Sequence, residues 1–159
     1  MNKNKKVFIT GASGGIGSAL CEKFLEQNFC LVLTSSSTEK IEKLKKTYGS
    51  NHYYYKVDLS NSDDLQNCLD KISQDHKDIT VIINNAGKTH DNLIFRMKNE
   101  QWSEVIQTNL NSNYQIIKSL LPNMLTNKYG RIIGIASIVG STGNPGQANY
   151  VASKSGLVG

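Results

Sequence analysis

The stretch TGASGGIG (Thr10–Gly17) decides the fold, because it stands between two different patterns. An apolar run at 6–10 precedes it and predicts a short strand, while apolar residues recur through 16–27 with the spacing of one helix face. Its glycines follow G-x-x-x-G-x-G, which allows a tight turn and a close approach of the backbone to a pyrophosphate. A merely flexible loop is the alternative. Because a strand precedes the turn and a helix follows it, the sequence favours a nucleotide-cofactor site.

Outward from this turn, apolar runs alternate with helical patterns along the whole chain. Further strands are predicted at 30–34, 52–57, 79–84 and 131–136. Further helices are predicted at 39–48, 60–73, 101–128 and from 149 onward. Pro122 is expected to kink or divide the long helix. Strands that are apolar on both faces and alternate with helices predict an α/β fold, a Rossmann-like doubly wound parallel sheet in three layers, αβα.

Bulk composition limits the classes of function. With 159 residues, 38% of them hydrophobic and 19% charged, the chain predicts one globular domain over 1–159. No apolar run is long enough to span a membrane, and no basic block indicates a nucleic-acid partner. The formal net charge of +5 favours an anionic ligand or an acidic partner, or is a solvated surface excess. Cys21, Cys30 and Cys68 lack metal-ligand or redox spacing, so we expect no metal site and reduced thiols in a cytoplasmic protein.

The loop after the second strand bears on the choice of cofactor. In an open α/β sheet the ligand crevice lies at the carboxyl ends of the strands, where an acidic residue bonds the ribose 2′-hydroxyl of NAD. Residues 34–37 read TSSS, so no carboxylate there would repel a 2′-phosphate, which favours NADP(H). Lys40 is the nearest cation, and from sequence alone we favour the alternative that it is a solvated lysine on a helix surface.

A second candidate site is NYVASKSG (149–156). Tyr150 and Lys154 stand four apart, on one helix face. An ammonium near a phenol favours the phenolate, so the pair can exchange a proton with a carbonyl oxygen by general acid–base catalysis. Ser137 ends the fifth strand and can hold that oxygen, and Asn109 lies mid-helix, where asparagine is a poor helix former. An exposed tyrosine–lysine pair, an ordinary loop serine and an exposed helical asparagine are the alternatives.

Five motifs in register point to one family. They are TGxxxGxG at 10–17, NNAG at 84–87, Asn109, Ser137 and YxxxK at 150–154. Together they resemble the short-chain dehydrogenase/reductase family over the whole chain. Two stretches, NNAGKTHDNLIFRMKNEQW (84–102) and GRIIGIASIVGSTGNPGQANYVASKSGLVG (130–159), are similar to the bacterial and organellar 3-oxoacyl-[acyl-carrier-protein] reductases of type II fatty acid synthesis.

The resemblance implies a role for each matching residue. Tyr150 would be the proton donor, and Ser137 would hold the substrate oxygen beside it. Lys154 would bind the nicotinamide ribose and favour the phenolate, and Asn109 would support a water–lysine proton relay. The implied cofactor-binding residues are Gly11, Ala12, Ser13, Gly14, Gly15, Ile16 and Gly17 around the pyrophosphate, Ser36 near the adenosine phosphate, Asp58 and Leu59 near the adenine, Asn85 near the cofactor ribose, and Ala86, Gly87, Tyr150 and Lys154.

The implied activity is the NADPH-dependent reduction of 3-oxoacyl-[acyl-carrier-protein] to its 3-hydroxyacyl form. Acyl carrier protein would be the partner, and the enzyme would be a dimer or tetramer in the cytoplasm or, in a eukaryote, in an organellar matrix. Two positions depart from the family pattern. Gly14 stands where the glycine turn often has an arginine. Lys128 replaces a carrier-docking arginine beside the fifth strand, which keeps the charge but not the bidentate fork.

Two other functional interpretations stay open. Another short-chain oxidoreductase, acting on a sugar, steroid or small alcohol, would share the cofactor and catalytic motifs. A cofactor-binding protein without turnover, or an inert fragment, would share the fold. Members of the family continue past the helix at 149 with two more strands and a loop that covers substrate. We therefore expect this chain to be partial, with an unpaired edge and exposed apolar surface at its fifth strand.

Overall fold

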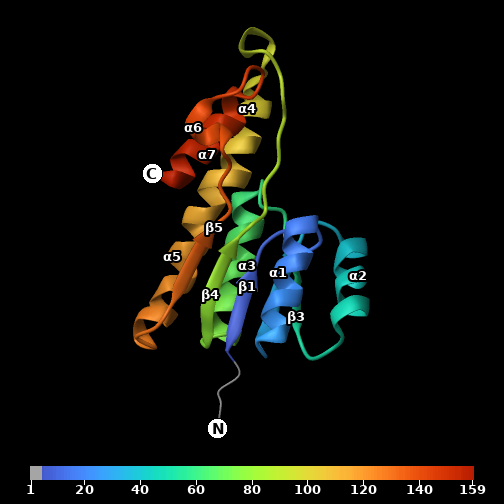
Figure 1. The fold of residues 1–159 in the computed structure, drawn as a ribbon. Helices are drawn as coiled ribbons and strands as arrows, with labels where there is room; N and C mark the ends of the chain where they lie inside the picture. The colour runs from blue at the N-terminus through green and yellow to red at the C-terminus, as the bar shows by residue number, and fades with distance from the viewer. Residues whose placement is uncertain (1–4) are drawn as a thin grey trace.

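The computed structural model describes residues 5–159, which form a parallel sheet with the strand order β3-β2-β1-β4-β5 (Figure 1). In chain order, the strands are β1 (Lys6–Ile9), β2 (Cys30–Ser35), β3 (Tyr53–Lys56), β4 (Ile79–Asn84) and β5 (Arg131–Gly134). Every neighbouring pair is parallel. The chain builds the sheet outward from β1 first on one side and then on the other. The Rossmann-like α/β fold expected from the sequence is confirmed.

Helices cover both faces of the sheet. α1 (Gly15–Glu26) and α2 (Thr38–Tyr48) pack on one face, and α3 (Ser62–Asp75) and α5 (Ser112–Thr126) pack on the other. Because successive side chains of a strand point to opposite faces, β1 contributes Val7 and Ile9 to the core under α1 and α2, and Phe8 to the core under α3 and α5. The sheet is thus the middle one of three layers.

Polar residues fix where the covering helices begin. The Ser37 side chain accepts a hydrogen bond of 3.3 Å from the Lys40 N–H and caps α2. The Asn61 side chain accepts from the N–H groups of Asp63 and Asp64, both at 3.0 Å, and caps α3. The two aspartates also place negative charge at the positive end of the α3 dipole. Both helix starts follow the strand ends closely, so the loops there are short.

A smaller group of helices stands beyond the carboxyl ends of the strands (Figure 1). It comprises η1 (Ile94–Arg96), α4 (Asn99–Ile106), α6 (Val139–Thr142) and α7 (Ala148–Val158). Two hydrogen bonds join its loops, because Asn92 N–H donates to the Gly146 carbonyl at 2.8 Å and the Gln147 amide donates to Asp91 Oδ2 at 2.9 Å. α6 was not predicted, since the surrounding glycine-rich sequence shows no helical periodicity.

The long helix predicted over 101–128 is interrupted, but not at Pro122. α4 passes into a π-helical segment, η2 (Gln107–Asn111), and then into α5, which contains Pro122. The expectation that proline would divide the helix was wrong. Pro122 lies in the penultimate turn of α5, where the loss of one backbone hydrogen bond does not end the helix. A π segment carries an i→i+5 hydrogen-bond pattern that the 3.6-residue periodicity does not reveal.

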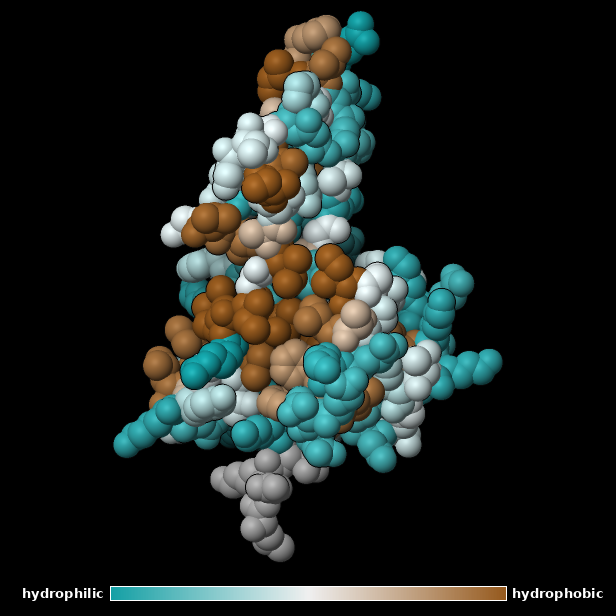
Figure 2. All heavy atoms as spheres, viewed as in Figure 1, coloured by the Kyte–Doolittle hydropathy of each residue, from teal (hydrophilic) through white to brown (hydrophobic). Residues whose placement is uncertain are grey.

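β5 forms one edge of the sheet, as expected. Its side chains Ile132 and Ile133 are 42% and 43% exposed. Figure 2 shows apolar residues gathered on this side of the molecule, over β5 and its neighbours. Within residues 5–159, no helix combines the length and the apolar character needed to cross a membrane.

Candidate active site

The turn between β1 and α1 requires glycine at two positions. Gly11 has a φ of +64°, in the left-handed region, and a Cβ added to it would lie 2.9 Å from Ala86 Cα. A Cβ on Gly17 would lie 2.8 Å from Ala12 Cα. Gly15 is different, because no described atom outside its immediate neighbourhood lies within 4 Å of an added Cβ. Gly15 lines the cavity described below, so a side chain at this position would take up room that a ligand could occupy.

Thr10 and Asn85 join this turn to the segment after β4. The Asn85 side-chain amide donates to the carbonyls of Thr10, at 2.9 Å, and Gly11, at 3.1 Å. The Thr10 hydroxyl in turn accepts from the N–H groups of Asn85, at 3.1 Å, and Ala86, at 3.0 Å. The NNAG motif is therefore fixed against the glycine turn, at the edge where the adjacent strands β1 and β4 both end.

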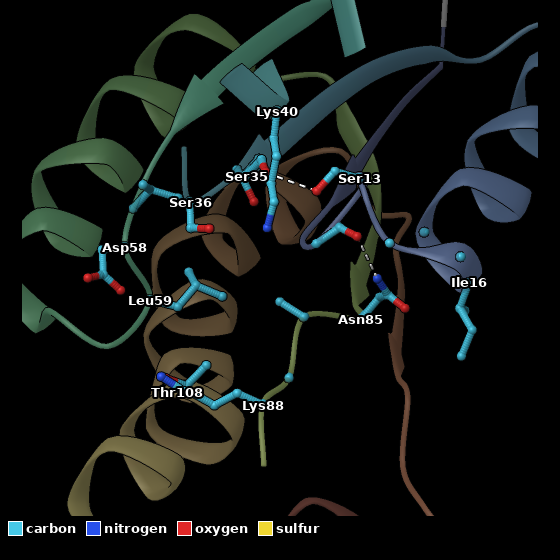
Figure 3. A pocket seen from close by; sticks show the side chains of 18 residues that line it. Ser13, Ile16, Ser35, Ser36, Lys40, Asp58, Leu59, Asn85, Lys88 and Thr108 are labelled. Carbon is cyan, nitrogen blue, oxygen red and sulfur yellow. Dashed lines mark hydrogen bonds between the residues drawn. The ribbon is translucent and has the colours of Figure 1, made fainter. Parts of the chain in front are cut away.

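A cavity of about 540 Å³ lies along the carboxyl ends of β1 to β4 (Figure 3). This volume suits a small-molecule site. Most of the predicted cofactor-binding residues line it, namely Gly11, Ser13, Gly14, Gly15, Ile16, Gly17, Ser36, Asp58, Leu59, Asn85, Ala86 and Gly87. Ala12 is instead buried beneath the turn.

Six lining residues were not among the cofactor-binding residues predicted from the sequence, although 34–37 and Lys40 had been considered for the cofactor phosphate. The six are Thr34, Ser35, Lys40, Val57, Lys88 and Thr108. Lys88 directly follows the NNAG motif and Val57 directly precedes Asp58, so adjacency to a predicted site residue was the available signal. Thr108 comes from the π segment, for which the sequence carries no signal.

The cavity is suited to an anionic nucleotide. Within the described chain, no side chain caps α1 at Gly14 and no acidic residue stands in its first turn. Its first N–H groups are thus left for an anion. At the other end, hydrogen bonds from Ser60 lower the pKa of Asp58, with the serine hydroxyl 2.7 Å and its N–H 2.9 Å from Oδ1. The ionised carboxylate can accept from an amino group such as that of adenine. The residues present therefore fit a dinucleotide.

Lys154 brings a buried ammonium group to the rim of this cavity. The side chain is 4% exposed, and its Nζ donates to the Ile135 carbonyl at 2.6 Å. Burial lowers the pKa of Lys154. Its Nζ lies 5.7 Å from the centroid of the Tyr150 ring and 3.5 Å from the position of a Cβ added to Gly87. α7 thereby places the ammonium beside both the tyrosine and the cavity wall.

Asn109 is buried rather than exposed, and its side chain is fully engaged. Its Oδ1 accepts from the Lys88 N–H at 2.9 Å, and its Nδ2 donates to the Lys88 carbonyl at 2.9 Å and to the Ser153 hydroxyl at 3.1 Å. Its own carbonyl accepts from the Asn113 amide at 2.7 Å. The side chain therefore joins the segment after β4 to α7, one residue from Lys154.

The remaining predicted site residues lie outside the cavity wall. Ser137 and Tyr150 are both partly exposed. Ser137 lies shortly after the end of β5 and Tyr150 in the first turn of α7, but neither belongs to the described cavity lining. Lys128 lies at the opposite end of β5, just after α5, with a φ of +53°. β5 alone spans about 10 Å at roughly 3.3 Å per residue, and Ser137 follows three residues after its end. The structure thus separates Lys128 from the other site residues.

Comparison with known proteins gives consistent results. The sequence profile of the short chain dehydrogenase family matches residues 5–159. The chain is 39% identical over 157 residues to the 3-oxoacyl-[acyl-carrier-protein] reductase of Haemophilus influenzae, covering 99% of this chain and 65% of that protein. It is 36% identical to the Escherichia coli protein of the same name, covering 99% and 64%. Nodulation protein G of Rhizobium sp. is 38% identical, with 98% and 63% covered.

A solved structure is also similar. It is a metagenomic short-chain oxidoreductase in complex with NADP, with a TM-score of 0.90 and 31% sequence identity. The match covers 98% of this chain and 72% of that one. The chain spans just under two thirds of the length of the three curated relatives named above, 63% to 65%.

Proposed function

The chain belongs to the short-chain dehydrogenase family, and from that premise we propose that it catalyses the NADPH-dependent reduction of 3-oxoacyl-[acyl-carrier-protein] to 3-hydroxyacyl-[acyl-carrier-protein]. The observation that carries the proposal is the placement of Lys154, whose ammonium lies beside Tyr150 and beside Gly87 in the cavity wall. The names of the Haemophilus and Escherichia relatives support this substrate class. The Rhizobium relative has a different name, so the substrate has to be tested directly.

The cavity residues divide the proposed cofactor among them. The glycine turn and the first N–H groups of α1 would hold the pyrophosphate. Asp58 and Leu59 would contact the adenine, and Lys154 would bond the nicotinamide ribose. The bound nicotinamide supplies the hydride that this class of reaction needs. The complex of NADP with a structural relative supports the assignment.

Tyr150, Ser137 and Lys154 would carry out the proton chemistry. Tyr150 would give its phenolic proton to the carbonyl oxygen of the substrate as the carbonyl is reduced to an alcohol. Ser137 would donate a hydrogen bond to the same oxygen and hold it in place. The Lys154 ammonium favours the phenolate that remains. Asn109 would hold this helix against the segment after β4 through Lys88 and Ser153.

The acidic carrier would dock around Lys128. Lys128 and Arg131 supply two positive charges there, among the exposed side chains of Leu125, Tyr129 and Ile132. A substrate held by this carrier must extend beyond the length of β5, which is about 10 Å at roughly 3.3 Å per residue, to reach Tyr150. Assembly into a dimer or tetramer and a cytoplasmic location are part of the same proposal, and exposed Trp102 and Tyr114 on α4 and α5 support the assembly.

The proposal is tested by following NADPH oxidation with a 3-oxoacyl group on acyl carrier protein, the same group on coenzyme A, and a panel of sugar, steroid and small-molecule ketones. We expect the highest kcat/KM for the carrier-bound substrate. Lys128→Gln should raise KM for that substrate on the order of threefold to tenfold and leave the coenzyme A thioester unchanged, because a rim charge acts on encounter with the partner. Lys46→Gln, an exposed lysine of α2, is the control. A preference for a sugar or steroid ketone would refute the proposal.

A further inference from the structure

Two lysines line the cavity, and they differ in their surroundings. Lys88 forms an ion pair with Glu104, so its charge is already compensated. Lys40 has no carboxylate within 4.0 Å among residues 5–159. Figure 3 shows its side chain reaching from α2 into the cavity, with the nitrogen end on the side of the serine hydroxyls. Lys40 is therefore an uncompensated positive charge directed into a site for an anionic ligand.

Serine hydroxyls surround the place where Lys40 enters. Ser35 ends β2, and its hydroxyl lies 3.0 Å from the hydroxyl of Ser13 in the glycine turn. Ser36 follows it in the cavity lining. The cap that Ser37 makes with the Lys40 N–H fixes Lys40 in the first turn of α2. Hydroxyl donors and one ammonium thus meet between the ends of β1 and β2, next to the glycine turn.

We propose that Lys40 is the residue of this chain that selects a cofactor with a 2′-phosphate. This inference rests on the proposed function in so far as the cofactor is a nicotinamide dinucleotide. The pyrophosphate has its own donors at the start of α1, so a cation at the end of β2 serves a second anionic group. A phosphate monoester carries a charge of about −1.5 to −2 near pH 7. The ammonium and the serine hydroxyls can donate to its oxygens, and 34–37 contains no carboxylate that opposes it.

The glycine turn shows why the cation comes from α2. A Cβ added to Gly14 would meet only the Gly11 carbonyl oxygen, at 3.5 Å, which is ordinary contact. The backbone at 14 would therefore accept a side chain, but the sequence supplies none. Lys40, from the first turn of α2, lines the same cavity as Gly14 and supplies a cation there. Lys40 is exposed, as the interpretation of a surface lysine favoured from sequence alone implies, but it also lines the cavity.

The test compares NADPH and NADH affinities, measured by fluorescence titration, for the purified protein and three variants. Lys40→Gln should weaken NADPH binding roughly 10- to 100-fold, the range expected when a hydrogen bond to a charged group is lost, and should change NADH binding less than twofold. Lys40→Arg should restore most of the NADPH affinity. Lys46→Gln, on the same helix but outside the cavity lining, should change neither. Adenosine 2′,5′-bisphosphate should compete with NADPH, and Lys40→Gln should weaken this competition more than competition by adenosine 5′-phosphate.

Two outcomes would overturn the inference while leaving the proposed function standing. If Lys40→Gln weakens NADPH and NADH equally, Lys40 serves the pyrophosphate or the fold instead of the 2′-phosphate. If it weakens neither, Lys40 is a solvated lysine. Failure of the proposed function gives a different result, because the unaltered protein would then bind neither nucleotide or would bind NADPH without reducing a 3-oxoacyl thioester.

Discussion

The two ends of the sheet are built from similar kinds of residue but treat their polar groups differently. At the amino end, buried His76 after α3 is surrounded by partners. Its Nε2 lies 2.7 Å from the Tyr55 hydroxyl, and its Nδ1 accepts from Lys6 Nζ at 3.3 Å. Lys6 also pairs with Asp78 at 2.8 Å and lies 5.0 Å from the centre of the Tyr53 ring. The described polar groups of this cluster satisfy one another.

At the carboxyl end, the corresponding groups are left incomplete. Lys154 donates to one carbonyl, Lys40 has no carboxylate within 4.0 Å in the described chain, and the first N–H groups of α1 have no cap. Polar groups that lack hydrogen-bond partners are costly to bury unless a ligand supplies the missing partners. The difference indicates that the amino end stabilises the fold and the carboxyl end binds and reacts. Substitutions at each end test this division.

Substitution of Tyr150 is expected to have the largest effect, and this effect should be on turnover alone. Tyr150→Phe keeps the ring and removes only the transferable proton, so turnover should fall by about 10²–10⁴-fold while NADPH affinity and thermal stability stay the same. Lys154→Ala should reduce turnover to a similar extent and weaken NADPH binding as well, because it removes a ribose contact. Steady-state rates and NADPH titrations measure both effects.

The double variant gives the control for this pair. Because both residues serve one proton transfer, its loss should be much smaller than the product of the two single losses. Near-normal turnover of Tyr150→Phe would show that Tyr150 is not the acid and that this part of α7 is only a helix face.

The next largest effect is a difference in stability and NADPH binding between substitutions of two glycines in the same turn. Gly17→Ala should lower the free energy of unfolding by roughly 1–3 kcal/mol, because its Cβ would meet the backbone of Ala12. Gly15→Ala should leave stability unchanged and weaken NADPH binding, because its methyl group would project into the cavity. Urea unfolding and nucleotide titration of both variants give the comparison. Equal losses of stability would mean that Gly15 too is structural.

This difference between glycines marks a limit of prediction from sequence. The motif at 10–17 places a nucleotide site after the first strand, and the structure has a cavity there. A spacing pattern does not say which glycine meets backbone and which meets open space. The same limit applies to Lys40, because one lysine in a polar amphipathic helix has no distinguishing pattern. Only the parallel packing of β1 against β2 brings it opposite the glycine turn.

A smaller effect is expected at the amino end, on the pH dependence of stability. Burial, and then the charge of Lys6, lower the pKa of His76 below its usual value of about 6.5. The unfolded chain therefore binds this proton more readily. Stability should be complete above about pH 6.5 and should fall as the pH drops through the lowered folded-state value. The charged groups near His76 are Lys6, Asp75 and Asp78.

His76→Gln should flatten this acid dependence while NADPH affinity at pH 7.5 stays unchanged. His52→Gln is the matched comparison. Burial also lowers the pKa of His52, and its Nδ1 accepts a hydrogen bond of 3.2 Å from the Leu31 N–H. Urea unfolding between pH 5 and pH 8 measures the slopes. A change in nucleotide affinity with His76→Gln would break the proposed division between the two ends.

The smallest effect is expected at the one cavity lysine that has a partner. Glu104→Gln removes the carboxylate that compensates Lys88, so NADPH should bind slightly tighter, by up to about fivefold. Glu42→Gln, which frees exposed Lys45 away from the cavity, should have no such effect. Weaker NADPH binding by the Glu104 variant would mean that the ion pair holds Lys88 in a position the nucleotide needs.

The rest of the site was predictable to different degrees. Tyr150 and Lys154 are predictable as a pair because helical spacing alone puts them on one face. Asn109 is the opposite case, since its poor helix propensity singles it out but does not show that its amide is bound to Lys88 and Ser153. The π segment that carries Asn109 and Thr108 has no sequence signature. Residues that are brought together only by tertiary contacts are therefore the least predictable from sequence.

The hydrogen bond from Lys154 to the Ile135 carbonyl has a consequence for how sequences of this type can diverge. It closes the segment 135–154 into a loop of fixed length, and the backbones of Gly140 and Lys154 approach so closely that a Cβ on Gly140 would lie 3.0 Å from Lys154 C. Within that loop, the exposed positions 141, 142, 144 and 145 are free to change identity, whereas Gly143 has a φ of +74°, which favours glycine. An inserted or deleted residue between Gly146 and Lys154 would turn the ammonium away from Tyr150 or from β5. Selection should thus tolerate substitutions in this segment far more readily than changes in its length.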